Sequence, residues 1–182
     1  MVERIILILL IVLIVTMFLM IFTIVYNRFQ KFLIRIKVAE SNIDETLRNK
    51  YDTLDRAINI SRGITKIDEE LFKEIKELKE QKISSFELDR ALNTEINEFY
   101  MLKEKNPNLF QSEEFIRANN ELEDLEEVLV ALKIYFNNNI VEYNKLVRTF
   151  PTNLLAFVMR YKEKLFFDNK DMDDKNINDF KL

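Results

Sequence analysis

The sequence predicts an all-α protein, in which a single N-terminal transmembrane helix runs into an antiparallel four-helix bundle that is followed by a short terminal helix. Three observations predict this class. The 182 residues include one Gly and two Pro, too few of the turn residues that a sheet protein needs, and 48% are hydrophobic. An uncharged apolar run opens the chain. Beyond it, apolar residues recur at spacings of three and four, which is typical of helices that bury one face.

Composition also limits the chemistry. The chain has no Cys and no His, which excludes disulfides and thiolate metal sites and removes the commonest metal ligand and the usual base near neutral pH. The formal net charge of -4 argues against nucleic acid, because binding a phosphate backbone needs concentrated positive charge. We therefore expect no cofactor, no metal and no nucleic-acid partner.

The apolar run IILILLIVLIVTMFLMIFTIVY, residues 5–26, has only Thr16 and Thr23 as polar residues. At ~1.5 Å per residue, a helix of this length matches the ~30 Å hydrocarbon core of a bilayer. A signal peptide fits poorly, because the run exceeds the usual ~7 to 15 residues and no small-residue cleavage site follows it. We predict that residues 1–26 form an uncleaved membrane anchor.

Four basic residues follow the run closely, whereas the N-terminal side offers only Arg4 and the amino group; the four are Arg28, Lys31, Arg35 and Lys37. The positive-inside rule then places the C-terminal part in the cytoplasm. This basic collar could also hold anionic lipid headgroups, although a short basic flank is usual for single-pass anchors and needs no special ligand.

An apolar stripe continues past the anchor, at Phe29, Phe32, Leu33, Ile36, Ala39, Ile43, Leu47, Leu54 and Ile58. Nothing between Tyr26 and Arg62 interrupts the pattern, so we expect the anchor helix to run directly into the first helix of the bundle. We expect that helix to end near Gly63, the only glycine, acting as a C-terminal cap.

A second stripe is expected at Ile64, Ile67, Leu71, Ile75 and Leu78. Ser84, with Glu87 three residues later, has the form of a capping box that opens a third helix. The apolar residues of this third helix are Phe86, Leu92, Ile96, Phe99 and Leu102. Asn106-Pro107 should end it, because proline restricts the residue before it and lacks an amide donor.

Ser112, followed by two acids, predicts the start of a fourth helix. Its stripe comprises Phe115, Leu122, Leu125, Leu129, Leu132, Phe136, Ile140, Tyr143, Val147 and Phe150. Asn137 to Asn139 fit around this stripe without interrupting it. Either one of these asparagines is hydrogen-bonded across helices or all three face water. The acidic sequence ELEDLEE, residues 121–127, is expected to form a solvated face.

Pro151 predicts a break, with Phe150 still pointing inward and Thr152 or Asn153 capping a short final helix. The expected core residues of that helix are Leu154, Leu155, Phe157, Val158 and Tyr161. The helical bundle is thus predicted over residues 27–167. Residues 168–182 are acidic but lack the glycine and terminal glutamate of a calcium loop, and we predict a disordered tail.

Several short motifs together resemble the LemA family of bacterial membrane-anchored helical proteins. They are Tyr26-Asn27, SNID at 41–44, RNKYD at 48–52, NPNLF at 106–110, FN at 136–137, EYN at 142–144 and RTFPTNLLA at 148–156. The likeness spans residues 1 to about 167. The chain departs from the family pattern at Asp55-Arg56, where the family tends to have Pro and Asn, and at Phe136, where it tends to have Tyr.

The resemblance implies a single span, a cytoplasmic bundle and a place in a bacterial inner membrane, while the family has no settled biochemical activity. Candidate structural or interaction residues from the motifs are Tyr26, Asn27, Asn137, Tyr143, Asn144, Arg148, Phe150, Pro151 and Asn153. We expect a non-enzymatic interaction or scaffold protein with a protein partner, and homo-oligomers stay open. The alternative is a carboxylate-based metal-binding or hydrolytic enzyme in the bundle core, although without His the usual di-iron ligand set cannot be made.

Overall fold

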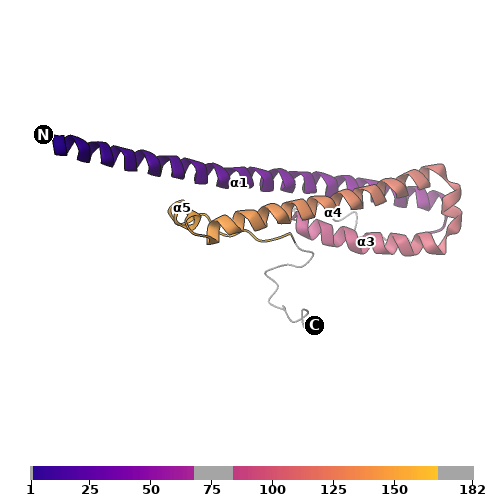
Figure 1. Ribbon diagram of the computed structural model, residues 1–182. Helices are drawn as coiled ribbons and strands as arrows, with labels where there is room; N and C mark the ends of the chain where they lie inside the picture. Colours follow the sequence, from indigo (N-terminus) through magenta and orange to yellow (C-terminus); the bar gives the residue numbers. More distant parts are fainter. Residues whose placement is uncertain (1, 68–83, 168–182) are drawn as a thin grey trace, which may run out of the picture. The chain divides into compact units, whose positions relative to one another are not determined.

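The computed structural model describes residues 2–67 and 84–167, and every regular element in these ranges is a helix (Figure 1). The α-helices are α1 (Val2–Ile64), α3 (Ser85–Lys105), α4 (Glu113–Arg148) and α5 (Thr152–Val158), with a 3₁₀ helix, η1 (Pro107–Gln111). The expected all-α class is confirmed. Contacts divide the chain into unit 1, residues 1–38 and 136–166, and unit 2, residues 39–135 and 167–182.

Helix α1 runs for 63 residues, which confirms that the apolar run continues into the following amphipathic stripe as one helix. The prediction of a glycine cap was wrong: Gly63 lies inside α1 and does not adopt a positive φ. The last turn is instead closed by an ordinary helical bond, in which the Thr65 amide donates to the Ser61 carbonyl at 2.9 Å. No left-handed residue is needed there.

Both expected boundaries of α3 and the expected start of α4 are confirmed. The Ser84 hydroxyl accepts the Glu87 amide, and the Glu87 carboxylate accepts the Ser84 amide, so the capping box is complete. Helix α3 ends at Asn106, and Pro107 opens η1. The Ser112 hydroxyl accepts the Phe115 amide at the start of α4. The helix expected from the second stripe and the tail expected at 168–182 lie outside the described residues, apart from Ile64, in the last turn of α1, and Ile67.

The core of unit 2 uses the predicted stripes of α1, α3 and α4. Its fully buried apolar side chains include Ile43, Leu47, Leu54, Leu92, Phe99, Phe115 and Leu122. Side-chain contacts run in opposite directions along α1 and α4, since Lys50 pairs with Glu126 and Thr53 bonds to Glu121. Along α1 and α3 the contacts run in the same chain direction, because residue numbers increase in both helices from the Asp44–Ser85 contact to the Lys50–Asn93 contact.

The core of unit 1 joins α1, α4 and α5. Its buried residues are Phe29, Ile36, Ile140, Tyr143, Leu146, Leu155 and Ala156, and Val25 and Tyr26 pack against them. The prediction that Phe150 points inward was wrong, because its side chain is 74% exposed. Helix α4 ends at Arg148, so the helical period that placed Phe150 on the stripe no longer applies two residues later.

Helix α5 also buries less than predicted. Leu155 and Ala156 face the core, and Tyr161 packs against it, but Leu154, Phe157 and Val158 are exposed. The expected side-chain cap was wrong as well. The N-cap residue is Pro151, with no capping side chain, and the Thr152 hydroxyl donates backwards to the carbonyls of Leu146 and Thr149 at 2.6 and 2.8 Å. Thr152 therefore stabilises the end of α4.

Candidate functional site

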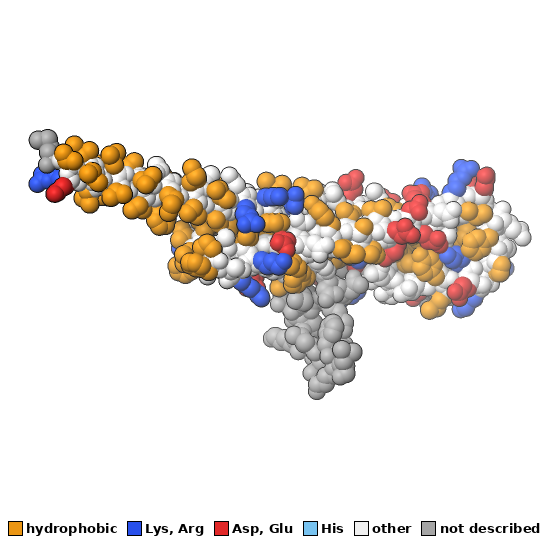
Figure 2. Space-filling model, in the orientation of Figure 1, with side chains coloured by type: hydrophobic (Ala, Val, Ile, Leu, Met, Phe, Trp, Pro, Cys, Tyr) orange, Lys and Arg blue, Asp and Glu red, His pale blue; other side chains and the backbone are white. Residues whose placement is uncertain are grey.

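The N-terminal part of α1 is an apolar surface on which none of the described residues packs. One helix in the described residues is long and apolar enough to cross a membrane, and its most apolar 18-residue window has a mean hydropathy of 3.5 and no buried residue. Every side chain from residue 2 to 24 is exposed, and Val25 and Tyr26 are the first to be half-buried. Figure 2 shows the hydrophobic side chains along this stretch and a second group over α5.

Three aromatic rings hold unit 1 together just after the apolar run. The Phe29 ring lies 5.8 Å from that of Tyr143 and 4.9 Å from that of Tyr161. The Gln30 amide donates to the Tyr161 hydroxyl at 2.9 Å. Burial, and to a lesser degree the neighbouring Tyr161, raises the pKa of Tyr143 above its ordinary value. This cluster fixes α4 and the segment after α5 against α1.

Two of the residues singled out from the sequence hold the segment that follows α5. The Asn144 side chain donates to the Lys164 carbonyl and accepts the Lys164 amide, both at 2.9 Å. Arg148 forms a two-point ion pair with Glu163, with Nε to Oε1 at 2.7 Å. Hydrogen bonding to Arg148 lowers the pKa of Glu163, and the same contact raises the pKa of Arg148. The motif residues therefore act as a clamp.

The other predicted residues lie around the same region of unit 1. Tyr26 is half-buried, with its ring stacked 6.4 Å from that of Phe22, and Asn27 is exposed. Asn137 is half-buried and Asn138 exposed, while Asn139 is 5% exposed, so at least one of the three asparagines is buried. All four residues of the basic collar are exposed.

The turn holds the last two predicted residues. The Phe150–Pro151 peptide bond is cis. Asn153 is half-buried, and its Oδ1 has no hydrogen-bond partner within the described ranges. The candidate residues chosen from the motifs therefore all lie in unit 1, where Tyr143, Asn144 and Arg148 make specific contacts.

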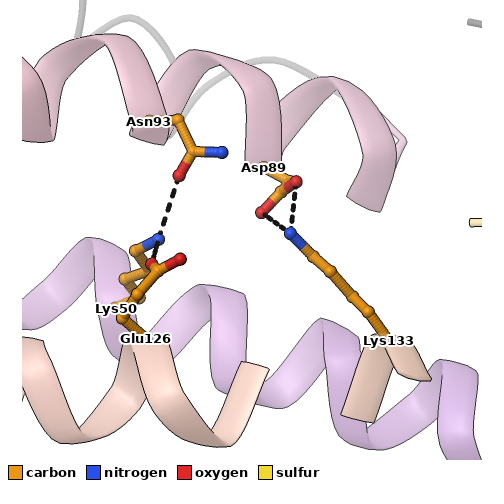
Figure 3. Close-up of polar contacts among 5 residues, drawn as sticks. All are labelled: Lys50, Asp89, Asn93, Glu126 and Lys133. Carbon is orange, nitrogen blue, oxygen red and sulfur yellow. Dashed lines mark hydrogen bonds and ion pairs between the residues drawn. The ribbon is translucent and has the colours of Figure 1, made fainter. Parts of the chain in front are cut away.

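Unit 2 contains buried charges that the sequence analysis missed (Figure 3). Lys50 has a side chain with no exposed surface, which pairs with the Glu126 carboxylate and donates to Asn93 Oδ1 at 3.1 Å. Lys133 donates to both oxygens of Asp89 at 2.7 Å, and Asp89 is 2% exposed. The signal was available, because Lys50 follows Leu47 by three residues and precedes Leu54 by four, which places it on the buried stripe.

A groove of unit 1 encloses about 260 Å³ and is lined by Asn144, Lys145, Arg148 and three neighbours. An open depression of about 530 Å³ lies at the end of α1 and is lined by residues 62–67, none of which is an acid. Across the described residues, no group of three or more Asp or Glu side chains could hold a metal ion. The buried carboxylate Asp89 is already matched by a lysine.

Comparison with known proteins agrees with the motifs. A search of curated proteins found no match to this chain. A scan against protein families matches residues 39–179 to the LemA family, which is most of the chain. This match covers the SNID, RNKYD, NPNLF and RTFPTNLLA motifs and contains all of the clamp and buried-charge residues. The chain therefore belongs to the LemA family.

Proposed function

We propose that this protein is a single-pass membrane protein whose helical part serves as a non-catalytic interaction or scaffold module at the cytoplasmic face of a bacterial cell membrane. The observation that carries the proposal is the wholly exposed apolar stretch of α1. Burying apolar surface is worth about 25 cal/mol per Å², so such a stretch is stable in a bilayer and not in water. Its continuity with α1 argues against a removable signal sequence.

The basic collar supports the cytoplasmic orientation. Arg28, Lys31, Arg35 and Lys37 follow the apolar stretch within eleven residues and are exposed. Positive residues near a span are retained on the cytoplasmic side. The opposing directions of contacts along α1 and α4 support the further proposal that the helices form an antiparallel bundle.

Paired reporter fusions test the orientation. A fluorescent protein that matures only in the cytoplasm and a phosphatase that is active only after export are fused in turn after Leu182. We expect fluorescence without phosphatase activity. The matched control replaces the four collar residues with Gln, which should give a mixed orientation. High phosphatase activity from the unchanged chain would contradict the proposal.

An interaction role is supported by exposed apolar residues on the outside of α4. Val128, Ile134 and Tyr135 are 48%, 56% and 45% exposed, on the helix that also carries the acidic sequence ELEDLEE at 121–127. Exposed apolar groups rimmed by charge are typical of protein-binding surfaces. A photoreactive amino acid at position 134 should give discrete crosslinked products in cells, whereas one at the exposed Asn120 should not. Equal products at both positions would contradict a specific surface.

We also propose that the protein does no catalysis. Support comes from the buried ion pairs of unit 2. The Glu126 and Asp89 carboxylates are paired with the Lys50 and Lys133 ammonium groups, whereas a catalytic or metal site would need carboxylates that are open to substrate or metal. The alternative, a carboxylate-based metal or hydrolytic site, is tested by the metal content of the purified full chain. Stoichiometric tightly bound metal would overturn the non-catalytic proposal.

A further inference from the structure

Helix α5 and the turn before it expose large apolar side chains that nothing in unit 1 covers. Phe150 is 74% exposed, Leu154 60%, Phe157 86% and Val158 69%. A helix of seven residues is too short to be stable alone. Helix α5 is held by the buried Leu155 and Ala156, by hydrogen bonds from Thr152 to the end of α4, and by the contacts of the segment that follows it. A short helix that is fixed in place with its apolar side outward indicates a binding surface.

Helix α5 lies next to the part of α1 where the apolar run ends, and this position indicates which partner covers its exposed apolar side chains. Leu155 and Ala156 lie in the same cluster as Val25 and Tyr26, and these are the first two residues of α1 that are not fully exposed. The uninterrupted apolar run ends at Tyr26. Helix α5 therefore lies beside α1 at the level where the apolar run ends. Figure 1 shows α5 next to α1 within unit 1. Its exposed apolar side chains continue the apolar surface of the span.

The charges around α5 suit an anionic surface. Residues 27–38 and 136–166 contain nine Lys or Arg and only two Asp or Glu, a formal net charge of +7. Both acids are already paired, Glu142 with Lys145 and Glu163 with Arg148. Arg160 and Lys162, which follow α5 directly, are exposed. Apolar side chains flanked by exposed cations are typical of segments that lie in the interface of an anionic membrane.

We propose that α5 and its preceding turn, residues 150–158, insert into the cytoplasmic leaflet beside the span and form a second membrane contact. This inference rests on the proposed membrane anchoring. The apolar side chains enter the boundary between headgroups and acyl chains, about 5–10 Å deep, and the neighbouring cations contact lipid phosphates. The Asn144 and Arg148 clamp holds the chain that leaves α5, so the inserted segment stays attached to unit 1.

The absence of Trp from the sequence makes the inference directly measurable. The full chain is reconstituted into vesicles of anionic and zwitterionic phospholipid, as three single-probe variants: Phe157→Trp in α5, Phe22→Trp in the span and Phe110→Trp in η1. Phe110 is the matched control, because it is a partly exposed phenylalanine in unit 2. Fluorescence quenching is measured with lipids brominated at shallow or deep acyl positions.

We expect the Phe157→Trp variant to be quenched several-fold more than the Phe110→Trp variant, and more by shallow than by deep bromines. The Phe22→Trp variant should be quenched at least as strongly. If the Phe22→Trp variant is quenched and the Phe157→Trp variant is not, the α5 inference is wrong and the anchor stands. If neither is quenched, the anchor proposal is wrong. Blue-shifted but unquenched emission from the Phe157→Trp variant would show that protein, such as a second copy of the chain, covers α5, and would also overturn the inference.

A second variant pair tests whether the apolar side chains drive the contact. In a Phe150→Trp background, Phe157→Asp should lower shallow quenching several-fold, while Phe110→Asp should leave it unchanged. Because the Phe157 side chain is 86% exposed, the substitution removes almost no packing, and unchanged circular dichroism verifies the fold. Quenching that is insensitive to Phe157→Asp would contradict insertion of the α5 surface.

Discussion

Two phenylalanines of unit 1 show how strongly one side chain's effect depends on its surroundings. Phe29 has no exposed surface and contacts two tyrosine rings, whereas Phe150 is 74% exposed. Removing a buried phenylalanine costs the transfer free energy of its atoms and leaves a cavity, while an exposed one loses little. The two positions therefore make a matched pair for measuring what the aromatic cluster contributes.

We predict that Phe29→Ala lowers the free energy of unfolding by ~3–5 kcal/mol and that Phe150→Ala changes it by less than about 0.5 kcal/mol. Urea unfolding of the full chain in mild detergent, followed by tyrosine fluorescence, measures both. The reporter is suitable because Tyr143 and Tyr161 lie in the cluster. A cost for Phe150→Ala as large as that for Phe29→Ala would show that Phe150 is buried in solution.

Alkaline pH should destabilise the fold through its buried tyrosines. Burial is the main cause that raises the pKa of Tyr51, Tyr100 and Tyr143 above 10.0. A raised pKa in the folded state means that folding favours the neutral phenol, so its contribution is complete below the unfolded pKa and is lost as pH rises past it. We predict that the free energy of unfolding falls above pH ~10. In the Tyr143→Phe variant this fall should be smaller, and an unchanged slope would contradict the assignment.

At the scale of elements, α3 is held to α4 by an ion pair as well as by apolar packing. Asp89 of α3 is 2% exposed and accepts two bonds from Lys133 of α4. Removing one partner of a buried pair leaves an uncompensated charge, whereas replacing both with apolar residues is often tolerated. The pair therefore makes the α3–α4 contact specific.

We predict that Lys133→Met lowers the free energy of unfolding by ~3 kcal/mol or more, and that adding Asp89→Leu recovers most of the loss. Unfolding of the two single variants and the double variant forms a double-mutant cycle. The exposed pair of Arg117 and Glu113 is a control that should show a coupling below about 0.5 kcal/mol. Additive losses at Asp89 and Lys133 would contradict coupling between them.

The capping box of α3 should respond to acid. Hydrogen bonds from Ser84 lower the pKa of Glu87, so the carboxylate contributes stability above its unfolded pKa and loses it as pH falls through the folded pKa. We predict that Ser84→Ala costs ~1 kcal/mol at neutral pH and that this cost shrinks in acid. Proton titration of Glu87 by NMR should show its pKa rising in the variant, and an unchanged pKa would contradict the cap.

The elements themselves could be predicted because α1, α3 and α4 carry long apolar stripes with explicit start and stop signals. The prediction errors concern residues whose surroundings are set by a tertiary contact or by the end of a helix, and not by the helical period of the apolar stripe. Lys50 occupies a stripe position, and its buried ammonium group is paired with Glu126. Glu126 is 76 residues away along the chain, so a single sequence cannot identify it as the partner. Phe150 was misplaced because the stripe was extended beyond Arg148, where the helix ends. The clamp from Asn144 to Lys164 likewise depends on tertiary contact.

At the scale of the whole molecule, the exposed apolar stretch of α1 should be separable from the rest of the chain, provided that the truncation keeps the residues that pack in unit 1. Val25 and Tyr26 pack against the Phe29 cluster. We predict that removing residues 1–24 gives a helical protein that stays soluble, and that removing residues 1–28 lowers its thermal midpoint by several degrees through lost packing. Ultracentrifugation measures the solubility of the two truncated proteins, and circular dichroism measures their helical content and thermal midpoints. Aggregation of the 25–182 protein would contradict separability.

On the proposed membrane anchoring, the continuity of α1 has a consequence for how the protein responds to the surrounding lipid. A span that is longer than the local hydrocarbon thickness tilts, and a thinner bilayer increases that tilt. In α1 no break separates the proposed span from the residues that follow it, since the helix runs from Val2 to Ile64. A flexible linker would absorb such a tilt, whereas this helix passes it on. Bilayer thickness thus becomes a variable that sets the angle at which the helix leaves the membrane.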